Sequence, residues 1–257
     1  DRFPANVSVV FRWGCTSSLP LPNGSFGASP LVVNSADSIH WCANKKQGRL
    51  EMQDAGVKVP ETWAASSFYN MRGAAYRIGE FVLRRDRHAQ GKDLWVGNTE
   101  TILDVIRRDT SLINGYVSRL VDKVAEYRVF VCQNRAVWVA KKTPGNPNDV
   151  AWNVAQGGRF DNVRWGDWPM AVVVEAMKAA KVSGTDFCGV DVMVDADGNP
   201  YVLEVNSAPS QTSPYRQQCV AKAFDYIVTN GKQHFDDVEN AQRWRDVIHP
   251  ALVTDEE

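Results

Sequence analysis

Two acidic residues and an asparagine stand at matched positions on two runs of alternating apolar residues, one on either side of Asp197-Gly198. An Asp-Gly pair in such a setting is a strong hairpin signal. Either a two-residue turn at Asp197-Gly198 or a four-residue loop over 196–199 pairs Asp191 with Glu204. Because side chains alternate along a strand, Asp191, Glu204 and Asn206 are predicted on one face. The apolar residues predicted on the opposite, core-facing side are Val190, Val192, Val194, Leu203 and Val205.

This acidic face favours a bound cation. Carboxylates on directly opposed residues, with Cβ atoms ~5 Å apart, repel each other unless a positive charge lies between them. Two carboxylates and an amide oxygen are hard ligands that suit Mg²⁺, which takes further oxygens from substrate phosphates. The hairpin therefore indicates magnesium and a nucleotide. The alternative is a solvent-facing hairpin whose acidic pair arose by chance. A calcium loop is disfavoured, because the matching alignment puts Met193 where a carboxylate is required and the flanking residues alternate like strands.

A second charged feature lies upstream, between residues 72 and 92. Its two acids, Glu80 and Asp86, are outnumbered by basic residues, so the segment is locally positive in a nearly neutral chain. The basic residues are Arg72, Arg77, Arg84, Arg85, Arg87 and Lys92. A bound anion is one explanation, and a solvated basic loop is the other.

Composition limits the possible functions. The 257 residues are 44% hydrophobic and 23% charged, with a formal net charge of -1, which is typical of a globular protein and gives no general reason to bind nucleic acid. No apolar run approaches the ~20 residues of a membrane span. The five scattered cysteines form no Cys-x-x-Cys pair, so a reducing, cytoplasmic location is expected. Residues 1–4 open without an apolar signal-peptide core.

The spacing of apolar and turn-forming residues predicts an α+β arrangement. Strands are predicted at 7–11, 31–33, 81–83, 94–96, 116–121, 127–131 and 136–140, and the hairpin supplies two more. Helices are predicted at 38–55, 101–109 and 169–181, with a further helix in the tail at 238–248.

Several motifs together resemble the ATP-grasp superfamily, especially its RimK-like carboxylate-amine ligases. Over residues 45–227, the similarity rests on Asp191 with Glu204-Val205-Asn206, on Glu126-Tyr127-Arg128, and on Asn44-Lys45 followed by Gly56-Val57-Lys58-Val59-Pro60. The resemblance implies an ATP-grasp fold with two α+β lobes gripping ATP and a reduced N-terminal α/β segment. The implied divisions are 1–44, 45–117 (N-lobe), 118–232 (C-lobe with the metal site) and 233–257 (C-terminal helix and tail).

The resemblance also assigns ligands to particular residues. Asp191, Glu204 and Asn206 are expected to hold magnesium, as two ions, with manganese as an alternative. Arg84 stands where the family has a phosphate-binding lysine and keeps its charge. The ATP-binding residues that the resemblance implies are Lys45, Arg84, the mobile-loop residues His88, Gln90, Gly91 and Lys92, and the hinge residues Arg119, Leu120 and Val121.

For catalysis, the resemblance implies that Arg128 stabilises an acylphosphate, with Lys141 on a neighbouring strand. Asn153 opens an Asn-x-x-x-Gly-Gly loop, and Arg159 follows it. The expected activity is ATP-dependent joining of a small-molecule or peptide carboxylate to an amine, with release of ADP and phosphate. A phosphotransferase on the same fold, a nucleotide-binding pseudoenzyme and, last, a nucleic-acid-binding module stay open as alternatives.

Overall fold

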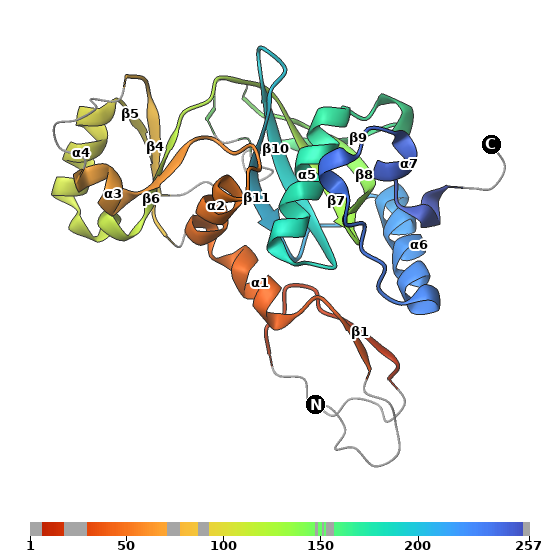
Figure 1. Cartoon of the computed structure of the whole chain (residues 1–257). Helices are drawn as coiled ribbons and strands as arrows, with labels where there is room; N and C mark the ends of the chain where they lie inside the picture. Colours follow the sequence, from red (N-terminus) through yellow and green to blue (C-terminus); the bar gives the residue numbers. More distant parts are fainter. Residues whose placement is uncertain are drawn as a thin grey trace.

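The computed structural model describes residues 7–17, 30–70, 78–86, 93–146, 149–150, 152 and 157–253. Within them the strands form three sheets, of two, four and five strands. Figure 1 shows the four-stranded sheet and its helices on one side of the molecule and the five-stranded sheet on the other, with the N-terminal strands set apart below. We call the part built on the four-stranded sheet (62–119) the small lobe, and the part built on the five-stranded sheet the large lobe.

The small lobe is an antiparallel sheet covered by helices. Its strand order is β3 (Thr62–Ala64), β6 (Tyr116–Arg119), β4 (Phe81–Arg84), β5 (Leu94–Gly97). Helices α3 (Ala65–Asn70) and α4 (Thr99–Arg108) belong to this lobe, and a 3₁₀ helix spans Thr110–Asn114. Phe81, Leu83, Ile102 and Ile106 form part of its core. The alternation of β4 therefore leaves Val82 and Arg84 on the other face, where both line a pocket.

The large lobe is an antiparallel sheet with a helix on each face. Its order is β11 (Pro200–Asn206), β10 (Phe187–Asp195), β7 (Lys123–Cys132), β8 (Arg135–Thr143), β9 (Arg159–Val163). One core contains Val129 and Val139 together with residues of α5 (Met170–Ser183). A second core contains Phe130 and Trp138 together with residues of α6 (Pro214–Asn230). Even-numbered residues of β7 and β8 thus point to the α6 side at this level of the sheet.

The N-terminal strands form a small parallel pair, β1 (Val9–Phe11) with β2 (Leu31–Val33). Phe11 stacks on Phe224 of α6 at 4.2 Å between ring centroids, which attaches the pair to the large lobe. Asn34 continues this attachment, because its side-chain oxygen accepts from the Asp186 backbone N–H at 2.7 Å.

The predicted helix over 38–55 is wrong as a single element. The structure has α1 (Ala36–Ala43) and α2 (Lys45–Asp54), separated at Asn44. The Asn44 side chain accepts from the Gln47 backbone N–H at 3.2 Å, so it caps α2 and restarts the helix in a new direction. Gly56, at φ +78°, follows the end of α2, as predicted.

The tail differs as well. Residues 238–248 form a 3₁₀ turn at Val238–Asn240 and a short α7 (Trp244–Val247) in place of one helix. Two further 3₁₀ turns lie at Trp165–Asp167 and Pro250–Leu252. Strands β3 and β9 and helices α3 and α6 were not predicted. The remaining predicted strands and helices are present, with ends shifted by a few residues.

Candidate active site

The hairpin β10–β11 pairs Asp191 with Glu204, as predicted, but by a different route. The loop has three residues, 196–198: the Gly198 N–H donates to the Asp195 carbonyl at 3.1 Å, and Gly198 lies at φ +83°. If the register next to the loop continued along the hairpin, Asp191 would pair with Leu203, one residue before Glu204. A β-bulge aligns the two acids, with Leu203 as the extra residue between the Val192–Val202 and Asp191–Glu204 pairs.

The bulge also reverses the predicted direction of Leu203. Val202 is fully buried in the core with Val190 and Val192, whereas Leu203 is only partly buried and lines the pocket. The prediction that Leu203 faces the core is therefore wrong, because one extra residue moves a side chain to the other face of a strand.

Asp191 is the centre of a charged row that crosses three strands. It is paired with Glu204 on β11 and with Arg128 on β7. The Arg128 guanidinium binds the Asp191 carboxylate with two hydrogen bonds, Nε to Oδ1 at 2.5 Å and Nη2 to Oδ2 at 2.7 Å. Burial opposes the charged carboxylate, yet Arg128 and Lys142 hold the pKa of Asp191 below its ordinary value. Asp191 is therefore an ionised acid inside the protein, 4% exposed.

Lys142, which the sequence analysis missed, lies in this site. Its ammonium contacts Glu126 and lies 3.7 Å from Asp191 Oδ2. Although burial acts against the ammonium, Asp191 and Glu126 raise the pKa of Lys142. Lys123 also binds Glu126, at 2.7 Å. These four residues form a buried network of two cations and two acids beside Arg128.

Lys141, which was predicted as a catalytic residue, is exposed, and its backbone pairs across the sheet with Tyr127. The reason is a second bulge. Beside the turn at Gln133-Asn134, Cys132 pairs with Arg135, and a register continued from there would set Lys141 opposite Glu126. The register shifts between Phe130 and Val131, where Val137 of β8 is the extra residue, so Lys142 takes that place. The prediction of Lys141 is a one-residue error caused by a bulge that has no clear sequence signal.

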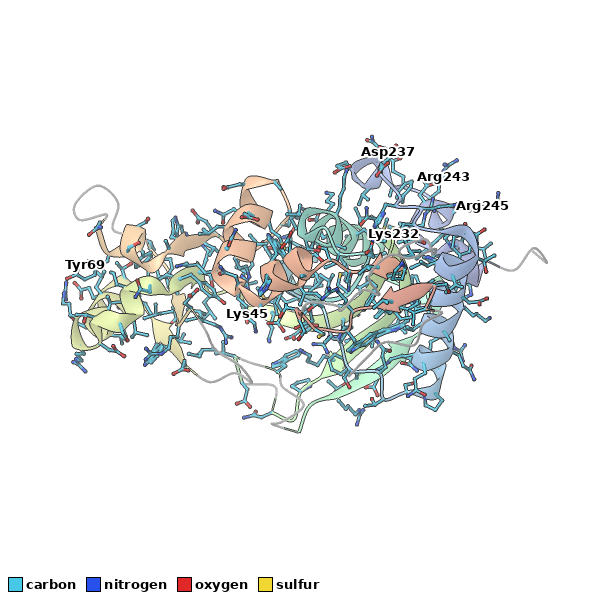
Figure 2. The ribbon with its side chains drawn as sticks, turned by 90° about the horizontal axis from the view of Figure 1, so that it is seen from below. Lys45, Tyr69, Lys232, Asp237, Arg243 and Arg245 are labelled. Atoms are coloured by element: carbon cyan, nitrogen blue, oxygen red, sulfur yellow. The ribbon has the colours of Figure 1, made fainter. Side chains whose placement is uncertain are left out.

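Glu204 receives its counter-charge from helix α2. Lys45 Nζ lies 2.5 Å from Glu204 Oε2, and the Asn206 side-chain amide donates to Glu204 Oε1 at 3.0 Å. Burial and the neighbouring Asp191 both raise the pKa of Glu204, but Lys45 and Asn206 outweigh them and the net pKa is lowered. Figure 2 shows Lys45 between the two lobes. The three predicted metal ligands and Lys45 are thus brought together.

Lys45, Asp191 and Glu204 line a pocket between the lobes of about 910 Å³, a volume that includes its open mouth, whereas Asn206 and Arg128 are not among its lining residues. Its charged lining includes cations from α2 and β4 and acids from the large sheet. The residues that line it are Lys45, Arg49, Pro60, Val82, Arg84, Tyr116, Ser118, Arg119, Leu120, Val121, Lys123, Glu126, Lys142, Val150, Trp152, Asp191, Met193, Leu203 and Glu204. Lys45, Arg84 and the three predicted hinge residues are all among them.

The hinge between β6 and β7 is held by backbone hydrogen bonds. The Arg119 N–H donates to the Glu61 carbonyl at 2.9 Å, and the Leu120 N–H donates to the Glu80 carbonyl at 2.8 Å. The Arg119 guanidinium also donates to the Ile78 carbonyl at 3.1 Å. Both backbone N–H groups already donate hydrogen bonds within the protein, so a ligand at the hinge would hydrogen-bond to other backbone groups of this segment.

Of the remaining predicted site residues, the structure describes only Arg159. Arg159 is exposed on β9 and binds Asp161 at 3.1 Å, so the structure does not bring it to the charged row. His88, Gln90, Gly91, Lys92 and Asn153 lie outside the described residues.

The donor set fits a hard divalent cation that also binds a phosphate. Asp191 and Glu204 are both ionised and offer carboxylate oxygens, and the side-chain amide of Asn206 lies beside Glu204. In the described part of the chain no group of three or more His, Cys, Asp or Glu residues could hold a metal. A cation here therefore needs oxygen ligands from elsewhere, which suits Mg²⁺ with phosphates better than a site made only of protein ligands.

Comparison with known families agrees with this geometry. The family described as "ATP-grasp domain, R2K clade family 3" matches residues 36–224, which is most of the chain. The chain belongs to this ATP-grasp family. The fold and the resemblance predicted from the sequence are thereby confirmed. The match spans both lobes and ends within α6.

Curated relatives of the chain are ligases by name. A "probable alpha-L-glutamate ligase" of Vibrio vulnificus is 28% identical over 185 residues, which are 70% of this chain and 60% of that protein. A "tetrahydromethanopterin:alpha-L-glutamate ligase" of Methanosarcina acetivorans is 26% identical over 211 residues, covering 70% of this chain and 63% of that protein. The chain thus spans less than two thirds of the length of these relatives.

Solved structures share the fold. The ATP-grasp ligase PsnB, complexed with precursor peptide PsnA2 and AMPPNP, aligns with a TM-score of 0.56 at 18% identity, covering 79% of this chain and 64% of that one. D-alanine–D-alanine ligase from Bacillus anthracis aligns with a TM-score of 0.54 at 14% identity, covering 78% and 71%. Separately, no helix in the described part of the ATP-grasp chain has the length and apolar character to cross a membrane.

Proposed function

We propose that this ATP-grasp protein is a ligase that uses ATP to join a carboxylate to an amine through an acylphosphate. The observation that carries the proposal is the row Glu204–Asp191–Arg128, of which Glu204 and Asp191 line the pocket between the lobes. It combines ionised oxygen ligands for a metal with a fixed guanidinium, which are the groups that phosphoryl transfer to a carboxylate requires.

Each charged residue has a role in this reaction. Lys45 and Arg84 line the pocket and supply positive charge for the phosphates. Magnesium, when bound by Asp191, Glu204 and Asn206, would neutralise phosphate charge and orient the terminal phosphate. Arg128 is already held by Asp191, so its guanidinium is oriented before a substrate arrives and stabilises charge that develops on the acylphosphate.

The two chemical steps need no nucleophilic side chain. First, a carboxylate oxygen bonds to the γ-phosphorus of ATP while the bond from that phosphorus to the β-phosphate oxygen breaks, and ADP leaves. Second, the amine nitrogen bonds to the acyl carbon, the carbon–oxygen bond to phosphate breaks, and the amine loses its extra proton to solvent. The protein contributes position and charge.

We infer that one substrate is an amino acid of the glutamate type. The support is the naming of the curated relatives as alpha-L-glutamate ligases. The five cysteines are free, and three of them are buried, which supports a reducing compartment such as the cytoplasm.

The test is an ADP-release assay with ATP, Mg²⁺ and pooled amino acids and short peptides, with products identified by mass spectrometry. Glu204→Gln removes one metal charge and keeps the side-chain shape. Glu239→Gln is the matched control, because Glu239 lies far along the chain and pairs with Lys181 at the surface.

The expected result is ADP release that requires both Mg²⁺ and an amino acid, yields an amide, and falls on the order of 100-fold in Glu204→Gln but not in Glu239→Gln. A phosphorylated product without an amide would replace ligation with phosphotransfer. Failure of the parent chain to bind ATP would refute the proposal.

A further inference from the structure

Arg49 is a buried cation without a matching anion. It lies on α2, is 7% exposed and lines the pocket. Within the described residues no carboxylate forms an ion pair with it, and its Nη1 has no hydrogen-bond partner. Burial lowers the pKa of its guanidinium. A buried arginine in this state is costly, and an apolar side chain of similar volume would pack more cheaply.

The contact that Arg49 does make is with the bulge. Its Nε donates to the Leu203 carbonyl at 2.6 Å. Leu203 is the extra residue that brings Glu204 opposite Asp191. A bulge interrupts the regular pairing of a strand, so its backbone groups need partners from outside the ladder.

Helix α2 therefore contacts β11 at two consecutive residues, Leu203 and Glu204. Lys45 and Arg49 are four positions apart, so they lie on the same side of the helix, one turn from each other. Lys45 binds the Glu204 side chain, and Arg49 binds the backbone just before it. A metal held by Glu204 would compete with Lys45 for that carboxylate, whereas the Arg49 contact is to a backbone carbonyl and does not involve the carboxylate.

We propose that Arg49 is a positioning residue that holds the Leu203 bulge in place and thereby fixes the predicted metal ligand Glu204 opposite Asp191. This inference rests on the proposed function, because it assigns Arg49 a part in metal binding. Without the Arg49 contact, the bulge can shift along β11, and a one-residue shift turns Glu204 away from Asp191.

The test separates metal binding from nucleotide binding. Mn²⁺ binding is measured by electron paramagnetic resonance at saturating ADP, and ADP binding without metal is measured by calorimetry in EDTA. The variants are Arg49→Met, which removes the donor, and Arg49→Lys, which keeps the charge and one donor. Arg135→Met is the matched control. Arg135 Nε also donates to a backbone carbonyl, that of Asp246 at 3.3 Å, but Arg135 begins β8, at the end of that strand away from Lys142 and the pocket.

We expect Arg49→Met to weaken Mn²⁺ binding by about 10- to 100-fold, the usual range for residues that orient metal ligands. Because Arg49 also lines the pocket, Arg49→Met should weaken metal-free ADP binding too, but by a smaller factor than it weakens Mn²⁺ binding, and Arg49→Lys, which keeps the charge, should regain part of the Mn²⁺ affinity. Arg135→Met should behave as the parent in both measurements.

Mn²⁺ affinity of Arg49→Met within twofold of the parent would overturn the inference and leave the proposed function intact. If Arg49→Met does not fold, Arg49→Lys decides, since unchanged affinity there together with intact ADP binding overturns the bulge contact as the cause. A parent chain that binds neither ADP nor Mn²⁺ refutes the proposed function, and this inference with it.

Discussion

His249 makes the stability of the protein depend on pH in a way that can be measured. Its side chain is fully buried, and its two ring nitrogens have different partners. Nδ1 accepts from the Ala251 N–H at 3.3 Å, so Nε2 carries the proton and faces the Gln133 side-chain oxygen at 3.2 Å. Burial, with a smaller effect of Arg135, lowers the pKa of His249 from 6.5 to about 4.

The sign and size follow from linkage. The unfolded chain takes up the His249 proton near pH 6.5, but the folded chain does so only near pH 4. The unfolded state therefore binds more protons between these values, and stability falls as the pH is lowered through this window. At about 1.4 kcal/mol for each pH unit, the loss attributable to His249 reaches about 3 kcal/mol. Above pH 7 the contribution is constant.

The assay is urea unfolding at a series of pH values from 7.5 to 4.5 for the parent and for His249→Asn, whose side-chain oxygen can still accept from the Ala251 N–H. Acidic residues contribute to both curves, so the difference between them isolates His249. His40→Asn serves as a control at an exposed histidine. Parallel curves for the parent and His249→Asn would refute the reasoning and show that the imidazole is not buried in its neutral form.

Two predictions concern the charged network of the pocket. Asp191→Asn leaves Arg128 without its ionic partner in a largely buried position, so the free energy of unfolding should fall by about 3 kcal/mol. Mg²⁺ with ADP should also no longer raise the melting temperature of this variant. Equal stabilisation of the parent and the variant by Mg²⁺ with ADP would contradict this prediction. Lys142→Met should reduce ADP release at least tenfold and destabilise the protein by about 3 kcal/mol, because Glu126 and Asp191 lose a buried cation. Lys141→Met should change stability by less than about 0.5 kcal/mol, since Lys141 is exposed; the reverse ranking of the two lysines would show that the second bulge is misplaced.

Local patterns in the sequence determined which segments form strands and which acids stand together. The alternation around Asp197-Gly198 predicted the hairpin and the pairing of Asp191 with Glu204, and both are present. The fold and the ATP-grasp membership followed from motifs around these residues and are confirmed. Such features are local in the chain, because they depend on side-chain periodicity and turn-forming residues within a few positions of one another.

The tertiary structure decided which neighbours of those residues reach the pocket. Arg49 and Lys142 have no motif that marks them, and their places depend on how α2 and β8 lie against the hairpin. The bulge at Val137 selects Lys142 over Lys141, and the bulge at Leu203 aligns Glu204 with Asp191.

The sequence could not predict the two bulges because the side-chain pattern of a strand repeats every two residues. This pattern shows which residues alternate between the two faces, but not where an extra residue is inserted into one strand of a pair. A bulge costs little, suits many residue types and is stabilised by partners distant in sequence, as Arg49 is for Leu203 across 154 positions. The sequence by itself therefore determined the fold and the acidic pair, whereas packing between helix and sheet determined the cations that surround that pair.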